Sequence, residues 1–464
     1  MMELLRLCGY EAQEIESELP RVKKAFNKLG ITAQDIERAK QRLNKYYGVE
    51  LKGVRKILRL CIQELVNWTL AKEEGKTKFI YSFMATGFFD TIAYAVLSKS
   101  KEVYVGSLNS LHHTVLGSIF EKIVPILEAA EKRWLKAGAV AHCGNVKTTV
   151  GLIALDVIPK PDLLVNSGVL CETAPKTIDL LHELYGIPPF CYDTCQDRDI
   201  REYPEATKRI ADLLLKSSRR LTRRIEEIVG FEITDDMVRE ADEARRQLGK
   251  AIDAVQNLVS GSDPLVISAN HQSLWTQLLF LPMGKDRLPE ALDAINTLYE
   301  ELQERVNNGV GVVEKGAPRI VAILPSHYTD PSLDYMVGEM GMALVSTDMS
   351  FPISDVGDLK DSYEKLSVDG VQTSIHNSLA RRVTSITEGC KKLKVDGVMD
   401  RFHIGCRTVT ADALMIKDAI TKELGIPVLL VERDDFDPRV CNHQQYQKSL
   451  EVFRAMLTGS RQNK

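Results

Sequence analysis

Hydrophobic and polar positions divide the chain into helical stretches and stretches where short apolar runs alternate with amphipathic helices. Residues 1–76 repeat apolar side chains at helical spacing among Lys and Glu, and Thr32 with Asp35 three positions later is typical of a helix start. From Lys78 the pattern alternates, which predicts a parallel sheet with helices on its faces. The expected strands of this first region include Lys78–Phe83, Val103–Val105, Asp162–Asn166 and Pro188–Tyr192, and a further apolar run over residues 139–142 ends directly before Cys143.

The second half of the chain repeats this organisation after a helical interruption. Residues 199–259 are strongly helical and charged, without a strand pattern, and predict a helical arm. Alternation then resumes, and a last helix is expected over about residues 444–457. The expected strands of this region are Pro264–Ile267, Arg319–Leu324, Met342–Ser346, Asp396–Met399 and Pro427–Val431.

These patterns predict an α/β protein with two doubly wound parallel-sheet domains. We expect a helical N-terminal region over residues 1–76 and a first α/β domain over residues 77–198. The helical arm of residues 199–259 follows, and the second α/β domain occupies residues 260–464.

A faint internal repeat connects the two α/β regions. Each copy consists of a strand, a turn with a cysteine, an apolar helix, a glycine and a proline that opens the next strand. The copies are residues 162–188, with Cys171 in the turn, and residues 396–427, with Cys406 in the turn. Glycine followed by proline is the usual chemistry of a helix end. The repeat therefore predicts that the two cysteines occupy equivalent places.

Composition and charge exclude several classes of protein. Hydrophobic residues make up 44% and charged residues 27% of the 464 positions, as in ordinary soluble globular proteins. The net charge is −4, from 60 basic and 64 acidic residues, which does not indicate binding to nucleic acid or to a membrane surface. We find no signal-peptide pattern and no apolar run long enough to span a membrane, so we expect a cytoplasmic location.

The nine cysteines are the strongest chemical feature of the sequence. In a chain without a secretory signal they argue against a disulfide scaffold and favour metal ligands or reactive thiols. Cys8, Cys61 and Cys390 lie in helical patterns and are expected to be buried apolar side chains. The other six lie at or just past the carboxyl ends of expected strands, and they are Cys143, Cys171, Cys191, Cys195, Cys406 and Cys441.

The carboxyl edge of a parallel sheet is where ligands bind in open α/β folds, and the helix N-termini there favour negatively charged groups such as thiolates and sulfides. Structural zinc sites use tight C-x2-C pairs, whereas these six cysteines spread over most of the chain. We therefore predict an iron–sulfur cluster buried between the two domains. A dithiol redox site at Cys191 and Cys195, spaced C-x3-C, is a further possibility from the residues alone.

Four segments around these cysteines resemble a known family. They are residues 143–147, 165–173, 396–407 and 430–439, which contain Cys143, Cys171 and Cys406. In them the chain resembles the 2-hydroxyacyl-CoA dehydratase and benzoyl-CoA reductase family, with similarity from about residue 75 to the C-terminus. The resemblance implies two flavodoxin-like domains with a helical region. It also implies that these three cysteines ligate a 4Fe-4S unit and that an ATP-hydrolysing iron–sulfur reductase delivers electrons.

The absence of a G-x-x-x-x-G-K-[ST] phosphate loop agrees with an ATP site on that partner rather than on this chain. Three further cysteines, Cys191, Cys195 and Cys441, make the chain most similar to the double-cubane cluster branch of the family. That resemblance implies an 8Fe-9S cluster held by six cysteines, and reduction of small molecules such as acetylene, azide or hydrazine. It also implies a homodimer.

Three residues near the ligand cysteines are candidates for catalysis. His142 and His403 each lie within three residues of a predicted ligand and could supply protons, since an unperturbed imidazole has a pKa near 6.5. Arg407 could hydrogen-bond a sulfide. We keep two alternatives: the 4Fe-4S subunit of a 2-hydroxyacyl-CoA dehydratase or benzoyl-CoA reductase, and a non-catalytic electron carrier or zinc protein.

Overall fold

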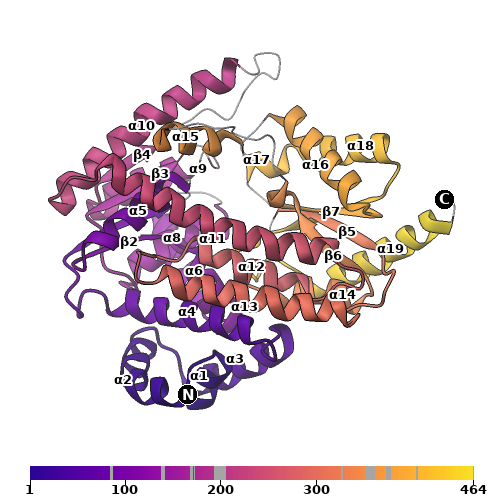
Figure 1. Cartoon of the computed structure of the whole chain (residues 1–464), viewed down its shortest axis with the longest axis horizontal. Helices are drawn as coiled ribbons and strands as arrows, with labels where there is room; N and C mark the ends of the chain where they lie inside the picture. Colours follow the sequence, from indigo (N-terminus) through magenta and orange to yellow (C-terminus); the bar gives the residue numbers. More distant parts are fainter. Residues whose placement is uncertain are drawn as a thin grey trace.

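Two four-stranded parallel sheets form the centre of the molecule (Figure 1). The computed structural model describes residues 1–83, 87–136, 142–167, 171, 173–192, 205–324, 328–351, 361–372, 378–403 and 406–462. The first sheet has the order β2-β1-β3-β4, from β1 (Lys78–Phe83), β2 (Val103–Ser107), β3 (Leu163–Ser167) and β4 (Pro189–Tyr192). The second has the order β6-β5-β7-β8, from β5 (Arg319–Ile323), β6 (Ala343–Thr347), β7 (Gly397–His403) and β8 (Val428–Arg433).

The two sheets have the same strand order, which confirms the predicted α/β class and the internal repeat. In both sheets the cysteine turn of the repeat follows the third strand in chain order, β3 or β7. The helix of each copy ends at a glycine with positive φ, Gly186 at 62° and Gly425 at 65°. A residue with a Cβ adopts this left-handed conformation only at a cost, which explains the glycine.

Helices cover both faces of each sheet, so that most strand side chains are buried, as expected for parallel sheets. Around the first sheet lie α5 (Gly87–Lys99), α6 (Ser110–His112), the π-helix His113–Ile119, α7 (Val124–Lys136), α8 (Gly144–Ala154) and α9 (Thr173–Tyr185). Around the second lie α14 (Pro331–Glu339), α16 (Leu379–Leu393), α17 (Arg407–Thr410), α18 (Ala413–Leu424) and α19 (His443–Gln462). Helices α12 (Gln272–Thr276) and α13 (Leu288–Asn307) pack against the N-terminal helix Lys52–Leu70, and α15 (Ser362–Gln372) packs against α5 on the side of the first sheet.

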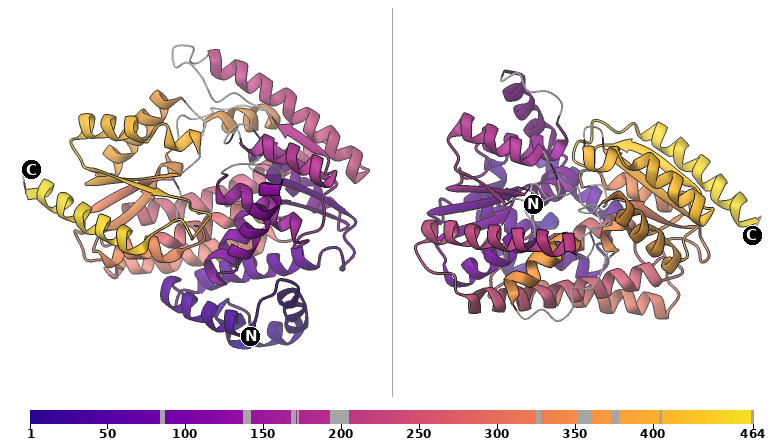
Figure 2. Two further views of the ribbon diagram at one scale, coloured as in Figure 1. Left: turned by 180° about the vertical axis from the view of Figure 1, so that it is seen from behind. Right: turned by 90° about the horizontal axis from the view of Figure 1, so that it is seen from above.

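The predicted helical arm consists of α10 (Glu205–Val229) and α11 (Asp235–Gly261). Helix α11 runs across the middle of the molecule and packs against α5 beside the first sheet and against β6 of the second (Figure 1). The views from behind and from above show α19 at the far side of the second sheet, away from the first (Figure 2). The arm therefore ties the two sheets together, while the domain boundaries given above stay a prediction.

The N-terminal region is helical as predicted, with α1 (Met2–Leu7), α2 (Ala12–Lys28), α3 (Ala33–Tyr46) and α4 (Lys52–Leu70). Its apolar side chains belong to a core that continues beneath both sheets. The predicted helix start at Thr32 is a capping box, in which the Asp35 N–H donates to Thr32 Oγ1 at 3.2 Å and the Thr32 N–H donates to Asp35 Oδ2 at 2.8 Å.

Substitution Thr32→Ala is expected to lower the free energy of unfolding by about 1 kcal/mol, because the first-turn amide of α3 loses its acceptor. Urea unfolding followed by circular dichroism measures this. Thr384→Ala is the matched control, since its hydroxyl only donates to the Ala380 carbonyl one turn earlier in α16. A control that loses as much stability as Thr32→Ala would contradict the capping argument.

The predicted strand Pro264–Ile267 is wrong. This segment is irregular, although Leu265, Val266 and Ile267 are buried. The Leu265 carbonyl accepts the Val312 N–H at 2.7 Å, and the Val266 carbonyl accepts Arg305 Nη1 at 3.0 Å. Burial and hydrogen bonding are therefore satisfied without a neighbouring strand, and a short apolar run alone does not distinguish the two cases.

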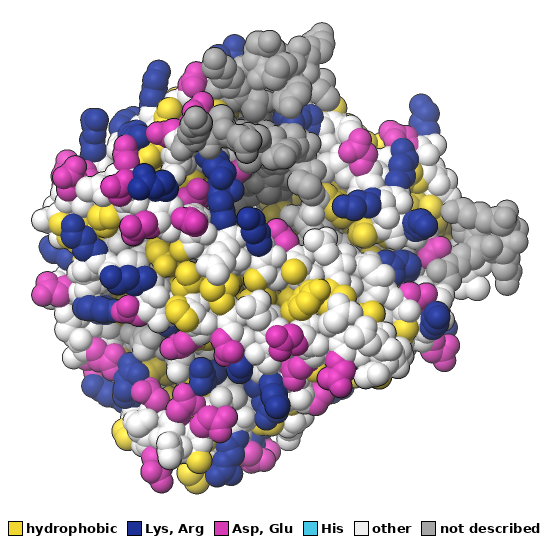
Figure 3. Space-filling model, viewed as in Figure 1, with side chains coloured by type: hydrophobic (Ala, Val, Ile, Leu, Met, Phe, Trp, Pro, Cys, Tyr) yellow, Lys and Arg dark blue, Asp and Glu magenta, His cyan; other side chains and the backbone are white. Residues whose placement is uncertain are grey.

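Basic and acidic side chains are interspersed over the face shown in Figure 3, with apolar side chains in a band across its middle. In the part of the chain that the structure describes, no helix combines the length and apolar character needed to cross a membrane.

Candidate metal centre

Three of the predicted ligand cysteines precede helices at the carboxyl ends of the sheets. Cys143 is the N-cap residue of α8. Cys171 follows β3 and lies just before α9, and Cys406 follows β7 and lies directly before the short helix α17. The Cys406 carbonyl accepts the Thr410 N–H at 2.9 Å, so the turn that carries this cysteine is continuous with the helix.

These three cysteines line one cavity of about 240 Å³ between the two sheets, although they come from three separate segments of the chain. Its described walls are mainly apolar and include no lysine or arginine. Residues from both sheets contribute, and the apolar ones are Phe83, Leu108, Val146, Phe280, Leu324, Tyr328, Met349, Val409 and Phe436.

The surroundings of Cys143 disfavour a free thiolate. Burial raises the pKa of the Cys143 thiol, the Asp434 carboxylate raises it further, and Cys171 and Cys406 add to this effect. The backbone N–H of Val146, in the first turn of α8, acts in the opposite direction. A metal bound in the cavity would supply the positive charge that stabilises the Cys143 thiolate.

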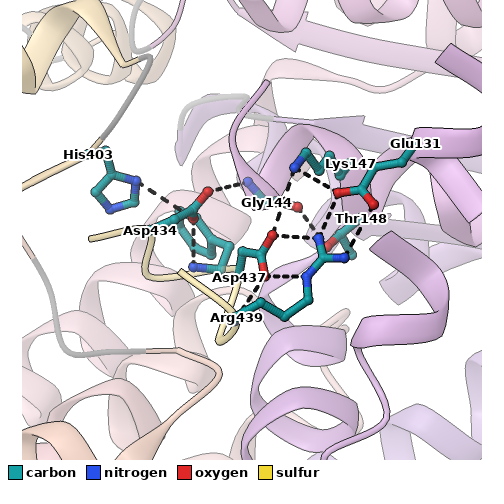
Figure 4. A network of polar contacts seen from close by, with 9 residues as sticks. Glu131, Gly144, Lys147, Thr148, His403, Asp434, Asp437 and Arg439 are labelled. Atoms are coloured by element: carbon teal, nitrogen blue, oxygen red, sulfur yellow. Dashed lines mark hydrogen bonds and ion pairs between the residues drawn. The ribbon is translucent and has the colours of Figure 1, made fainter. Parts of the chain in front are cut away.

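The segment Asp434–Arg439, which follows β8, crosses from the second sheet to the first and is called the strap below. Asp434 Oδ2 accepts the Gly144 N–H at 2.6 Å, directly beside Cys143 (Figure 4). A Cβ on Gly144 would lie 2.6 Å from the Phe436 carbonyl carbon, so glycine allows the strap to approach the start of α8. The strap thereby places Asp435 and Phe436 in the wall of the cavity.

His403 forms a buried pair with the strap. Its Nε2 lies 2.8 Å from Asp435 Oδ2, and its Nδ1 lies 3.9 Å from Asp434 Oδ1. Burial lowers the pKa of His403, but Asp435 and then Asp434 outweigh it, so the pKa of His403 lies above its ordinary value. Arg433 Nε lies 2.5 Å from Asp435 Oδ1, so the Asp435 carboxylate lies between the Arg433 guanidinium and the His403 imidazole. The pair can therefore hold a proton in the cavity wall. The sequence predicted a role in proton supply for His403 but not for Asp435.

The sequence interpretation missed several cavity residues of the first sheet. His113 Nε2 lies 2.9 Å from Thr148 Oγ1, and its ring lies 4.7 Å from that of Phe436. Asn109 has a φ of 81° and donates from Nδ2 to the Asn145 carbonyl, to Asn145 Oδ1 and to Thr149 Oγ1 at 2.6–2.9 Å. Asn and Asp tolerate the left-handed backbone region better than other side chains. No sequence pattern around Asn109, however, indicated that it would adopt this conformation or line a cavity.

The remaining candidates lie elsewhere or are not described. Cys191 is exposed within β4, an edge strand, and Cys441 is partly buried beside Met336 and Leu429. Neither lines the cavity. His142 is half-buried beside Cys143 and does not line it either; burial, Lys147 and Lys176 lower the pKa of His142. Cys195 and the side chain of Arg407 lie outside the described residues.

The three cysteines assigned to helices are buried as predicted. Cys8, Cys61 and Cys390 are each at most 1% exposed, and all belong to the apolar core. Burial raises the pKa of Cys61 and Cys390 to about 12, as expected for inert thiols.

Among the described residues, no three His, Cys, Asp or Glu side chains converge closely enough to hold a single metal ion. A tetrahedral zinc site requires such convergence. An iron–sulfur cube differs, because each thiolate binds a different iron atom and the ligands surround the cluster instead of one point. The arrangement of the cysteines around an open cavity therefore fits a cluster better than zinc.

We compared the chain with family models, curated proteins and solved structures. No curated protein matches the chain. Among solved structures, the SBP FpvC from P. aeruginosa, in complex with a Ni²⁺ ion, is 9% identical, and the match covers 83% of this chain and 98% of that one. Its TM-score of 0.19 is too low to support a shared fold or ligand. The model of the 2-hydroxyglutaryl-CoA dehydratase D-component family matches residues 117–457, which include Cys143, Cys171 and Cys406. The chain therefore belongs to the 2-hydroxyacyl-CoA dehydratase family, represented by this D-component model.

Proposed function

We propose that the chain is an iron–sulfur enzyme component in which Cys143, Cys171 and Cys406 hold a 4Fe-4S cluster inside the cavity. The observation that carries this proposal is that three cysteines from distant segments line one mainly apolar cavity. Cys143, Cys171 and Cys406 would supply three thiolate ligands to such a cluster, fewer than its four irons. When bound, such a cluster supplies electrons at low potential and an iron atom that can bind a substrate atom.

The cavity walls support a role for this chain in proton supply. His403, with its pKa raised by Asp435 and Asp434, holds a proton at its imidazole beside the cysteine turn. Apolar side chains such as Phe436 and Val409 exclude water from the same space.

Electrons must come from outside the chain in this proposal. The family resemblance implies an ATP-hydrolysing iron–sulfur reductase as the partner, and a phosphate-binding loop of the G-x-x-x-x-G-K-[ST] type is not found in this sequence. A homodimer and a small-molecule substrate of the acetylene, azide or hydrazine type remain predictions from the family resemblance.

The larger 8Fe-9S cluster also remains a prediction. It requires Cys191, Cys195 and Cys441 as additional ligands. The positions of Cys191 and Cys441 outside the cavity wall favour the smaller cluster, which corresponds to the dehydratase or benzoyl-CoA reductase subunit.

The wild-type protein, purified without oxygen and reconstituted with iron and sulfide, is expected to bind about four iron atoms per chain and to show thiolate-to-iron absorption. Iron and acid-labile sulfide analysis measures this. About eight iron atoms per chain would replace the proposal by the double cubane, and a colourless protein that binds zinc but not iron would refute both.

A further inference from the structure

We propose that Arg439 and Glu131 form a latch that holds the strap closed over the cysteine cavity, and that both act as positioning residues for the metal centre. This inference rests on the proposed function for the identity of the group that the cavity holds. The contacts that carry it lie outside the cavity and are independent of any cluster.

The latch joins the two halves of the molecule. Arg439 lies at the end of the strap, after β8, whereas Glu131 lies on α7 beside the first sheet. Arg439 Nη2 donates to Glu131 Oε1 at 2.7 Å and Nη1 donates to Oε2 at 3.2 Å, so the guanidinium grips the carboxylate with two nitrogens (Figure 4). A planar guanidinium makes such a bond, whereas an ammonium binds as a point charge.

The same guanidinium also orders the strap itself. Arg439 Nε donates to Asp437 Oδ1 at 2.8 Å and Nη2 donates to Asp437 Oδ2 at 2.7 Å. Lys147 of α8 completes the network, because its Nζ lies 2.9 Å from Glu131 Oε1 and 3.8 Å from Asp437 Oδ2. Arg439 and then Lys147 lower the pKa of Glu131 to about 2, so its charge persists at neutral pH.

The contacts of Arg439 also determine where the strap lies over the cavity. Between Asp434, bonded to the Gly144 N–H, and Asp437, bonded to Arg439, lie only Asp435 and Phe436. Asp435 pairs with His403, and the Phe436 ring stacks on Tyr328 with ring centres 5.4 Å apart. Two anchored ends thus fix both side chains that the strap contributes to the cavity wall. Release of one end should uncover the cavity and disturb the position of Cys143 beside Gly144.

The Arg439–Glu131 ion pair is partly exposed to solvent, so its dependence on salt concentration can be tested. The side chains of Arg439 and Glu131 are 33% and 32% exposed, so salt can screen their attraction, whereas Asp437 is 3% exposed. Opening should therefore increase with ionic strength in the wild-type protein, without any substitution.

The experiment measures site-resolved alkylation of the full-length chain by N-ethylmaleimide before metal reconstitution, followed by mass spectrometry. Removal of a charge-assisted contact should shift the opening equilibrium by roughly tenfold or more. We expect Arg439→Gln and Glu131→Gln to speed alkylation of Cys143 and Cys406 by about this factor, with Arg439→Lys between them and wild type. The effect of the double variant should be clearly smaller than the product of the two single effects, since both substitutions remove the same Arg439–Glu131 contact.

Arg21→Gln is the matched control, because Arg21 grips Glu74 with two nitrogens, at 2.8 and 2.7 Å, within the N-terminal helices. Exposed Cys191 gives the intrinsic reaction rate, and buried Cys61 and Cys390 report general loosening. A selective increase at Cys143 and Cys406, also seen in wild type at high salt, supports the latch. Rates equal to those of Arg21→Gln, or an equal increase at Cys61 and Cys390, overturn it.

Iron analysis separates this inference from the proposed function. If wild type binds no iron, the proposed function fails, while the alkylation rates still decide on the latch. If wild type binds iron, the latch variants are expected to retain less of it under equal conditions. Unchanged alkylation together with normal iron in all variants overturns the latch and leaves the cluster proposal intact.

Discussion

Substitution Cys143→Ser is expected to remove most of the bound iron while the fold is retained. Cys143 is the N-cap residue of α8, and serine is among the best N-cap residues, so the helix keeps its start. A serine hydroxyl is a much poorer iron ligand than a thiolate, because it loses its proton far less readily than a thiol. Because loss of residues behind metal ligands already weakens binding by roughly 10–100-fold, loss of a ligand should exceed that range. Iron and sulfide per chain, with circular dichroism as the test of folding, measure the result.

The controls for this substitution come from the other cysteines. Cys390→Ala, in the core helix α16, should keep the wild-type iron content. Cys191→Ser and Cys441→Ser distinguish the two clusters, because loss of iron there would support the larger one. A folded Cys143→Ser protein that binds as much iron as wild type would refute the proposed ligand set.

The architecture and the cysteine positions could be predicted because both depend on local patterns. A strand, a cysteine turn and a helix that ends at glycine recur around Cys171 and Cys406, and parallel sheets bring such turns to one edge. The identical order of the two sheets follows from this repeat. The capping box at Thr32 is equally local, since both of its residues lie within one turn.

The cavity wall could not be predicted, because it is made by contacts between distant segments. The strap and Gly144 are 290 residues apart, and no pattern in either one indicates the other. His113 lies in a π-helix beside the first sheet and packs against Phe436 of the strap, a contact that no local pattern around either residue indicates. The segment Pro264–Ile267 failed for the opposite reason, since its apolar residues are buried by tertiary packing without forming a strand.

The close approach of the strap to α8 gives a second strong expectation, at Gly144. Replacement of glycine by alanine within a helix ordinarily stabilises it by up to about 1 kcal/mol. At Gly144 the new Cβ would lie 2.6 Å from the Phe436 carbonyl carbon and 2.8 Å from the Asp437 nitrogen, both of them backbone atoms. The strap must therefore move, and Gly144→Ala is expected to lower the free energy of unfolding by about 1–3 kcal/mol. The displaced strap and the adjacent Cys143 should also reduce bound iron.

Gly249→Ala in α11 is the matched control, because no atom lies within 4 Å of the position of its new Cβ. Urea unfolding of both variants should therefore give opposite signs, with Gly249→Ala unchanged or more stable and Gly144→Ala less stable. If Gly144→Ala were instead stabilised like its control, the strap would not press on the start of α8. The cavity would then lack the wall that Asp435 and Phe436 provide, and the site would have to be open to water. Opposite signs with reduced iron in Gly144→Ala would place the metal centre directly beneath the strap.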